Sequence, residues 1–136
     1  MVVLKNINHH EIDRMIEFAG KYDVILQLIE LLPPDNNSYY EDHSFNLEII
    51  EKELKKKSQK VETRKMQARK QYYFDDTIIE IIRPTHKLFC GNCTKLRITS
   101  DGKIKPCLMR NDNLVDFKDK TSFIEAINRR SVYNKK

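Results

Sequence analysis

A run of nine mostly apolar residues, Val24 to Leu32, constrains the fold of this chain more than any other feature. Only Gln27 and Glu30 interrupt the run, and Pro33-Pro34 ends it. A continuous apolar run bounded by turn residues is typical of a buried parallel strand that is covered on both faces. The run is too short to cross a bilayer, which takes about 20 apolar residues. We therefore expect an α/β protein with no membrane partner.

The residues before this run predict a strand and a helix. Val2 to Leu4 form a strand stub, and Asn8 with Glu11 resembles a capping box that opens a helix ending at a C-cap, Gly20. The apolar residues at helical spacing are Ile12, Met15, Ile16 and Ala19. Strand, helix and strand make one crossover unit of a sheet or barrel. We expect residues 1–34 to be the last unit of an incomplete TIM-like (β/α) barrel, because the apolar strand needs neighbours that the chain does not supply.

The middle of the chain, residues 35–70, predicts a loop and a basic helix. Residues 35–43 are polar and turn-rich, and Ser44 is placed to cap a helix. Its inward residues are Phe45, Leu47, Ile50 and Leu54. Between Lys52 and Lys70, nine basic residues stand against two acidic ones. Such a run could meet nucleic-acid phosphates. No zinc-finger or RNA-recognition motif accompanies it, so we interpret it as a solvated helix end and loop, with nucleic acid an unlikely partner.

The last part, residues 71–136, predicts a cluster-binding module of short strands and a helix. Two short strands precede the cysteines, at 72–74 and 77–82. A hairpin that reverses at Asp101-Gly102 then delivers Cys107. Ser122 with Glu125 resembles another capping box, and it opens a last helix.

All three cysteines of the chain lie in the run Cys90-Gly91-Asn92-Cys93 and at Cys107. Two thiolates on a tight turn and a third from a hairpin can hold a metal or an iron–sulfur cluster. Three sulfurs are one short of the four that usually close a zinc site or a cubane cluster. A vacancy would leave one metal site open for a substrate. His86 could instead complete a Cys3His zinc site, and reduced thiols without metal are a third alternative.

The composition favours a single cytoplasmic domain. With 136 residues, of which 40% are hydrophobic and 33% charged, the chain can bury only a modest core. Charged and polar residues at positions 9–13 interrupt any apolar segment of a signal peptide. In the reducing cytoplasm, an odd number of thiols is more naturally bound to metal than paired in disulfides.

Glu30 stands in a strongly apolar strand and has two interpretations. It could point into a barrel lumen, near cofactor or substrate. It could also pair with a nearby cation, because buried acids are seldom left unpaired. Gln27, three residues earlier, would face the other side of the strand.

The segment from Phe89 to Leu108 combines three features. They are a CxxC turn with thirteen residues before the third cysteine, a Lys-Leu-Arg-Ile-Thr strand, and an Asp-Gly-Lys turn leading into Pro-Cys-Leu. Together they closely resemble the C-terminal motif of the molybdenum cofactor biosynthesis protein A family, the radical S-adenosylmethionine enzyme GTP 3',8-cyclase. Met1 to Asn8 and Leu28 to Pro33 also resemble segments of that family. The resemblance covers nearly the whole chain, but only the C-terminal portion of a family member.

The resemblance implies that Cys90, Cys93 and Cys107 bind a [4Fe–4S] cluster through three irons, with the guanine of GTP at the open fourth iron. Arg97 matches one arginine that contacts the nucleotide in the family, and Lys95 stands where the family has the other. The family converts GTP to (8S)-3',8-cyclo-7,8-dihydroguanosine 5'-triphosphate. It uses a radical made from S-adenosylmethionine at a second [4Fe–4S] cluster.

That second cluster is bound in the family by an N-terminal CxxxCxxC motif, which this sequence does not contain. The family's Gly-Gly tail is also replaced, by Tyr133-Asn134-Lys135-Lys136. We therefore expect a C-terminal fragment of the cyclase that is inactive alone and needs the missing N-terminal barrel portion or a partner chain. A homodimer is a further possible arrangement of the chain. The alternative is a structural cysteine–zinc module without enzymatic activity.

Overall fold

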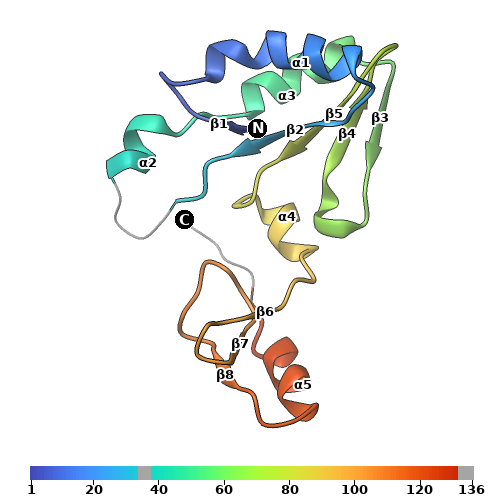
Figure 1. The fold of residues 1–136 in the computed structure, drawn as a ribbon. Coiled ribbons are helices and arrows are strands. Elements are labelled where there is room, and N and C mark those ends of the chain that lie inside the picture. Colours follow the sequence, from blue (N-terminus) through green and yellow to red (C-terminus); the bar gives the residue numbers. More distant parts are fainter. Residues whose placement is uncertain (34–37, 132–136) are drawn as a thin grey trace.

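The computed structural model describes residues 1–33 and 38–131, which form a larger and a smaller part (Figure 1). The strands are β1 (Val2–Val3), β2 (Leu26–Glu30), β3 (Lys60–Thr63), β4 (Lys70–Tyr73), β5 (Ile78–Ile82), β6 (Arg97–Ile98), β7 (Lys103–Lys105) and β8 (Val115–Asp116). The helices are α1 (Ile12–Lys21), α2 (Ser38–His43), α3 (Glu48–Lys57), α4 (Lys87–Gly91) and α5 (Thr121–Asn128). Two 3-10 turns are η1 (His9–Glu11) and η2 (Met66–Ala68).

The larger part is a five-stranded sheet in the order β1-β2-β5-β4-β3, with α1 and α3 on one face (Figure 1). The expected α/β class is confirmed. β2 pairs in parallel with β1 on one side and with β5 on the other. The expectation that the apolar strand lacks neighbours in this chain is therefore wrong, because β5 supplies the second one. β4 and β3 add to β5 in antiparallel pairing, so the sheet is mixed.

Two elements of the middle segment differ from the sequence prediction. Residues 38–43, expected as part of a loop, form α2. The basic run contains β3, whose residues Lys60-Val61-Glu62-Thr63 pair with β4 at the sheet edge. Charged residues suit an edge strand because they discourage pairing with the strands of other molecules. The same residues lack the apolar alternation from which a strand is predicted. The boundary expected between the middle segment and the last segment, at residues 70 and 71, falls inside β4.

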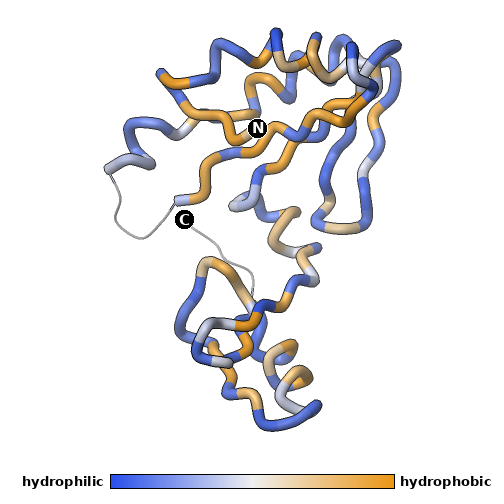
Figure 2. Tube along the Cα trace, viewed as in Figure 1, coloured by the Kyte–Doolittle hydropathy of each residue, from blue (hydrophilic) through white to orange (hydrophobic). Residues whose placement is uncertain are grey.

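The main core lies between the sheet and the helices. Figure 2 shows apolar residues along β2 and β5 and on the helices above them. The buried apolar residues are Val3, Ile12, Ala19, Leu26, Leu28, Leu47, Leu54, Tyr72, Ile79 and Ile81. Leu26 pairs with Ile79 and Leu28 with Ile81, so alternate residues of both strands face the helices. Ile12 and Ala19 of α1 are buried in this core, so the expected inward face of α1 is confirmed at these two residues.

The caps predicted for α1 are wrong at both ends. The Asn8 side chain accepts a hydrogen bond from the Leu4 amide at 2.7 Å and makes no cap bond, because η1 intervenes before the helix. Gly20 lies inside α1, and a Cβ there would come within 2.9 Å of the Asp76 carboxylate. The glycine therefore allows close packing of α1 against the β4–β5 turn and does not end the helix.

The caps predicted for the later helices are wrong as well. α3 begins at Glu48, four residues after Ser44, and its N-cap position is Leu47. Ser122 is already the second residue of α5, and its Oγ accepts a hydrogen bond from the Lys118 amide at 3.0 Å. Other polar residues lie at these helix starts, since Asn46 Oδ1 accepts from the Glu48 amide at 2.9 Å and Asp119 Oδ1 accepts from the Thr121 amide at 2.7 Å.

Glu30 lies at the end of β2 on the face that the helices cover. Its Oε1 accepts hydrogen bonds from the Leu47 amide at 3.0 Å and from Arg83 Nε at 3.1 Å. Both donors belong to the structural framework, one before α3 and one after β5. The interpretation of Glu30 as a paired structural acid is confirmed, and the alternative that it points into a lumen is wrong.

The opposite face of the large sheet is polar at its centre. Glu80, in the middle of β5, is fully buried. Its carboxylate accepts four hydrogen bonds, from Gln71 Nε2 at 2.9 Å, Arg69 Nη1 at 3.1 Å, Gln27 Nε2 at 3.2 Å and Arg64 Nη1 at 3.2 Å. Gln27 and Gln71 are the neighbours of Glu80 in register on β2 and β4. The two arginines come from the connection between β3 and β4.

The smaller part consists of the three-stranded sheet β6-β7-β8 with α5 packed on it. Ile104, Val115 and Ala126 form its buried core. The hairpin predicted at Asp101-Gly102 is confirmed, with Gly102 in the left-handed region at φ 79° that favours glycine. No helix in the described parts of the chain is long and apolar enough to cross a membrane.

We predict that Glu80→Leu lowers the free energy of unfolding by about 3–5 kcal/mol, the usual cost of removing one partner from a buried ion pair. The reason is that Arg69, whose side chain is only 17% exposed, loses its carboxylate. Urea denaturation followed by circular dichroism measures the change. The control is Glu125→Leu, which removes an exposed i,i+4 pair with Arg129 and should cost less than about 1 kcal/mol. Equal losses in the two variants would contradict the role given to Glu80.

Candidate functional site

The three cysteines line one cavity of about 170 Å³. The polar residues on its wall besides the cysteines are Gln67, Arg97, Arg130 and Ser131. The apolar residues on its wall are Leu32, Pro84, Phe89, Pro106, Leu108 and Met109. Because these residues come from both parts of the molecule, the cavity lies where the two parts meet. Figure 1 shows α4 on the connection between these two parts.

The CxxC turn is built on the short helix α4. His86 opens this helix, and its Nδ1 accepts a hydrogen bond from the Leu88 amide at 3.3 Å. Cys90 follows on the helix, and its thiol donates to the Pro84 carbonyl at 3.3 Å. The chain then turns, with the Cys93 amide donating to the Cys90 carbonyl at 3.2 Å. Both thiols of the turn are thereby placed on the wall of the same cavity.

Cys107 reaches the cavity from the smaller part. It stands two residues after β7, where Ile104 is buried in the small core, and directly after the fully buried Pro106. The Arg110 amide donates to the Cys107 carbonyl at 3.4 Å, which closes a turn around this cysteine. The third thiol therefore depends on the packing of the smaller part, and not on the CxxC turn.

The surroundings of Cys93 favour its thiolate form. Burial raises the pKa of the Cys93 thiol, but the backbone amide of Lys95 and the side chain of Gln67 donate hydrogen bonds to the sulfur and lower it. The Arg130 guanidinium lowers it further, so the pKa lies below its usual value overall. The thiolate is the form that binds metal. The Cys93 thiol therefore loses its proton more readily than an ordinary cysteine thiol does.

The three cysteines are the thiol donors that line the cavity. All three cysteines are half-buried and none forms a disulfide. Among the described residues, no three His, Cys, Asp or Glu side chains stand close enough to hold one metal ion. His86 does not line that cavity, so the structure does not bring the proposed Cys3His ligands together.

The two basic residues expected to contact nucleotide are placed differently. Arg97, on β6, lines the cavity, and its guanidinium makes no hydrogen bond or ion pair with the described part of the chain. Lys95 is exposed and does not line the cavity; it contributes its backbone amide to Cys93. Of the pair, only Arg97 has a side chain on the cavity wall. The tail residues 133–136 lie outside the described residues.

Sequence reasoning missed Gln67 and Arg130, which both line the cavity beside Cys93. Gln67 lies in the basic run, and nothing local in the sequence distinguishes it from a solvated residue. A weak signal existed for Glu80, whose setting Ile-Ile-Glu-Ile-Ile repeats the pattern that drew attention to Glu30. Both glutamates turned out to be paired acids.

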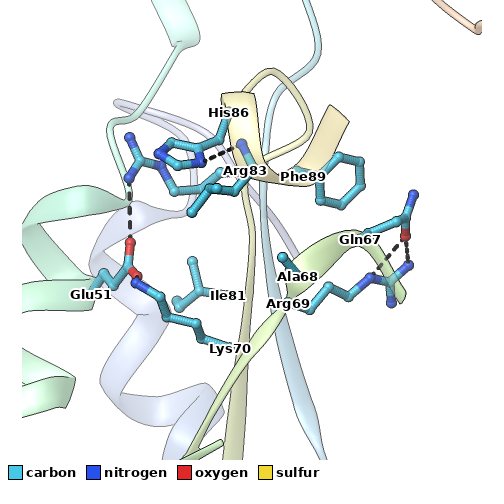
Figure 3. A pocket seen from close by; sticks show the side chains of 10 residues that line it. Glu51, Gln67, Ala68, Arg69, Lys70, Ile81, Arg83, His86 and Phe89 are labelled. Carbon is cyan, nitrogen blue, oxygen red and sulfur yellow. Dashed lines mark hydrogen bonds and ion pairs between the residues drawn. The ribbon is translucent and has the colours of Figure 1, made fainter. Parts of the chain in front are cut away.

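A second cavity, of about 80 Å³, adjoins the first and shares Gln67 and Phe89 with it (Figure 3). Its charged groups are ion-paired, some with one another and Arg69 with Glu80 outside the cavity. Glu51 accepts from Lys70 Nζ at 2.6 Å and lies 3.3 Å from Arg83 Nη1. Burial raises the pKa of Glu51, but these cations and Tyr72 lower it more. This second cavity is a structural ion-pair cluster.

The comparisons with known proteins agree with these features. The sequence model of the family described as Molybdenum Cofactor Synthesis C matches residues 24–130. A probable GTP 3',8-cyclase of Methanothermobacter marburgensis is 46% identical over 147 residues, covering 98% of this chain and 48% of the relative. Its counterpart in Methanothermobacter thermautotrophicus is 45% identical with the same coverage.

A probable GTP 3',8-cyclase of Thermococcus kodakarensis is 41% identical over 125 residues, covering 86% of this chain and 41% of the relative. The chain thus spans about half the length of the curated relatives it matches. The matched family segment contains the CxxC turn, Arg97 and Cys107. Since the family model covers most of the chain and the relatives exceed 40% identity, the chain belongs to the Molybdenum Cofactor Synthesis C family.

Proposed function

We propose that this chain is the C-terminal part of a GTP 3',8-cyclase of molybdenum cofactor synthesis, in which Cys90, Cys93 and Cys107 hold a [4Fe–4S] cluster. The observation that carries the proposal is the common cavity of the three cysteines and Arg97, in a chain whose relatives are named probable GTP 3',8-cyclases. Bound by three cysteines, a [4Fe–4S] cluster would have one iron without a protein ligand, which would be available to coordinate the purine of GTP.

The residues of this chain bind and orient the nucleotide. The guanidinium of Arg97 presents donors in a fixed fork, which suits oxygen and nitrogen acceptors of GTP. The apolar wall of the cavity excludes water and strengthens such polar contacts. Lys95, exposed near the turn, adds positive charge that attracts a polyphosphate. We therefore assign two contributions to this part of the protein: it orients the nucleotide and supplies positive charge.

The cyclisation itself needs components beyond these residues. We propose that S-adenosylmethionine and a second [4Fe–4S] cluster are held by a barrel portion outside this chain, in the same polypeptide or in a partner chain. The coverage of about half of the relatives supports this division. The parallel strands β1, β2 and β5 would then continue a TIM-like barrel, and the chain alone would be inactive. A reducing cytoplasm would keep the three thiols available for iron.

The alternative, a structural zinc module without activity, predicts a different metal content. We predict about four iron and four sulfide per chain in protein purified without oxygen, the content of one [4Fe–4S] cluster. Cys107→Ser should lose most of this iron, because it removes the ligand from the smaller part. His86→Asn should retain it, because asparagine still caps α4 while no imidazole is needed. Metal and sulfide analysis decides. Stoichiometric zinc without sulfide, lost in His86→Asn, would contradict the cluster.

We also predict that Arg97→Ala weakens GTP binding to the iron-loaded chain at least about tenfold, the loss of a charged hydrogen bond. Arg97→Lys should show an intermediate loss, because lysine keeps the charge without the fork. Equilibrium dialysis with labelled GTP measures both. Arg14→Ala, on the exposed side of α1, is the matched control and should bind as the parent chain does. An unchanged affinity in Arg97→Ala would contradict the assignment of Arg97.

A further inference from the structure

The turn η2 holds a backbone conformation that must be stabilised from outside. Gln67 has φ 61° and Ala68 φ 48°, both in the left-handed region that residues other than glycine rarely adopt. Gln67 is also only 5% exposed, although it lies within the basic run. Strained backbone of this kind persists only where surrounding contacts compensate it, and it is common near functional sites.

The contacts of Gln67 lead directly to the cysteine turn. Its backbone amide donates to the Asn92 carbonyl at 3.0 Å, between the two cysteines of the CxxC turn. Its side-chain Nε2 donates to Cys93 Sγ at 3.6 Å. One residue thus binds both the backbone and a sulfur of the turn.

A fixed partner determines which end of the Gln67 amide faces the sulfur. Arg69 Nε donates to Gln67 Oε1 at 3.0 Å, and Arg69 Nη2 donates to the same oxygen (Figure 3). A guanidinium can only donate, so the amide oxygen must face Arg69 and the NH2 group must face Cys93. Arg69 is held in turn by buried Glu80, at 3.1 Å. The chain of contacts runs Glu80, Arg69, Gln67, Cys93.

We propose that Gln67 is a positioning residue for the Cys93 thiolate and raises the reduction potential of the cluster that this cysteine binds. The inference rests on the proposed function, since it requires the cluster. An N–H donor to a ligand sulfur stabilises the more negative, reduced cluster, and hydrogen bonds to the sulfurs are among the factors that set such potentials. Reduction adds one electron, taken from dithionite in the test, and the amide proton stays on Gln67.

Arg130 also acts on Cys93, but it does so from the chain after α5. The charge of Arg130 is unchanged when Gln67 is substituted, so the effect of Gln67 on Cys93 can be separated from the effect of Arg130. Ligand-orienting partners of this kind commonly alter metal affinity by 10–100-fold when removed. Gln67 differs from Arg130 in being neutral, buried and fixed by the sheet.

The test is the midpoint potential of the cluster in the full chain reconstituted with iron and sulfide, titrated with dithionite and followed by electron paramagnetic resonance. Gln67→Met keeps the shape of the side chain, adds no charge and removes the donor. We expect the reduction equilibrium to fall about tenfold, a shift of about 59 mV to lower potential for one electron. Gln59→Met, at an exposed glutamine, is the matched control and should not shift it.

Two further variants keep the test decisive if Gln67→Met loads poorly. Gln67→Glu retains the acceptor for Arg69, loses the donor and adds a negative charge, so its potential should fall further. Arg69→Met releases the amide of Gln67 and should shift the potential in the same direction by less. Loaded Gln67→Met with an unchanged potential overturns the inference, as does a shift confined to Gln67→Glu. Failure of the parent chain to bind iron and sulfide would overturn the proposed function instead.

Discussion

The buried carboxylate of Glu80 needs compensation, because a charge removed from water costs several kcal/mol unless it is paired and hydrogen-bonded. Glutamines on the two neighbouring strands supply two of its four donors, and Arg64 and Arg69 supply the others. Both arginines belong to the connection between β3 and β4, which has little apolar content. The ion pairs therefore fix this connection on the polar face of the sheet, and η2, between the two arginines, is fixed with it.

The position of the cysteine turn depends on this arrangement. α4 has five residues and none of them is buried, so neither its length nor apolar packing makes it stable. Its specific attachments include the cap by His86, the bond from the Cys90 thiol to the Pro84 carbonyl, and the contacts of Asn92 and Cys93 with Gln67. The sheet thus determines where the CxxC turn stands, while the small core determines where Cys107 stands. The cavity between them requires both parts to be folded.

Local patterns in the sequence predicted what local interactions determine. The apolar strand β2 and the Asp101-Gly102 hairpin both depend on short-range patterns of residues. The sequence could not show whether Glu30 and Glu80 are paired with a cation or face solvent or substrate. Each is paired with an arginine that only the fold brings near. The position of Gln67 at the cavity could not be predicted for the same reason, because it depends on a contact with a cysteine 26 residues away.

The lysine at position 95 illustrates how unequal two adjacent basic residues can be. Its backbone amide serves Cys93, and any side chain except proline leaves that amide in place. Its ammonium is exposed and, under the proposed function, would act on phosphate as a mobile point charge without a fixed fork of donors. Arg97 instead stands on a strand at the cavity wall, where the fixed fork can match acceptors of a bound base. Under the proposed function, geometry would therefore constrain the residue type at position 97 more than at position 95.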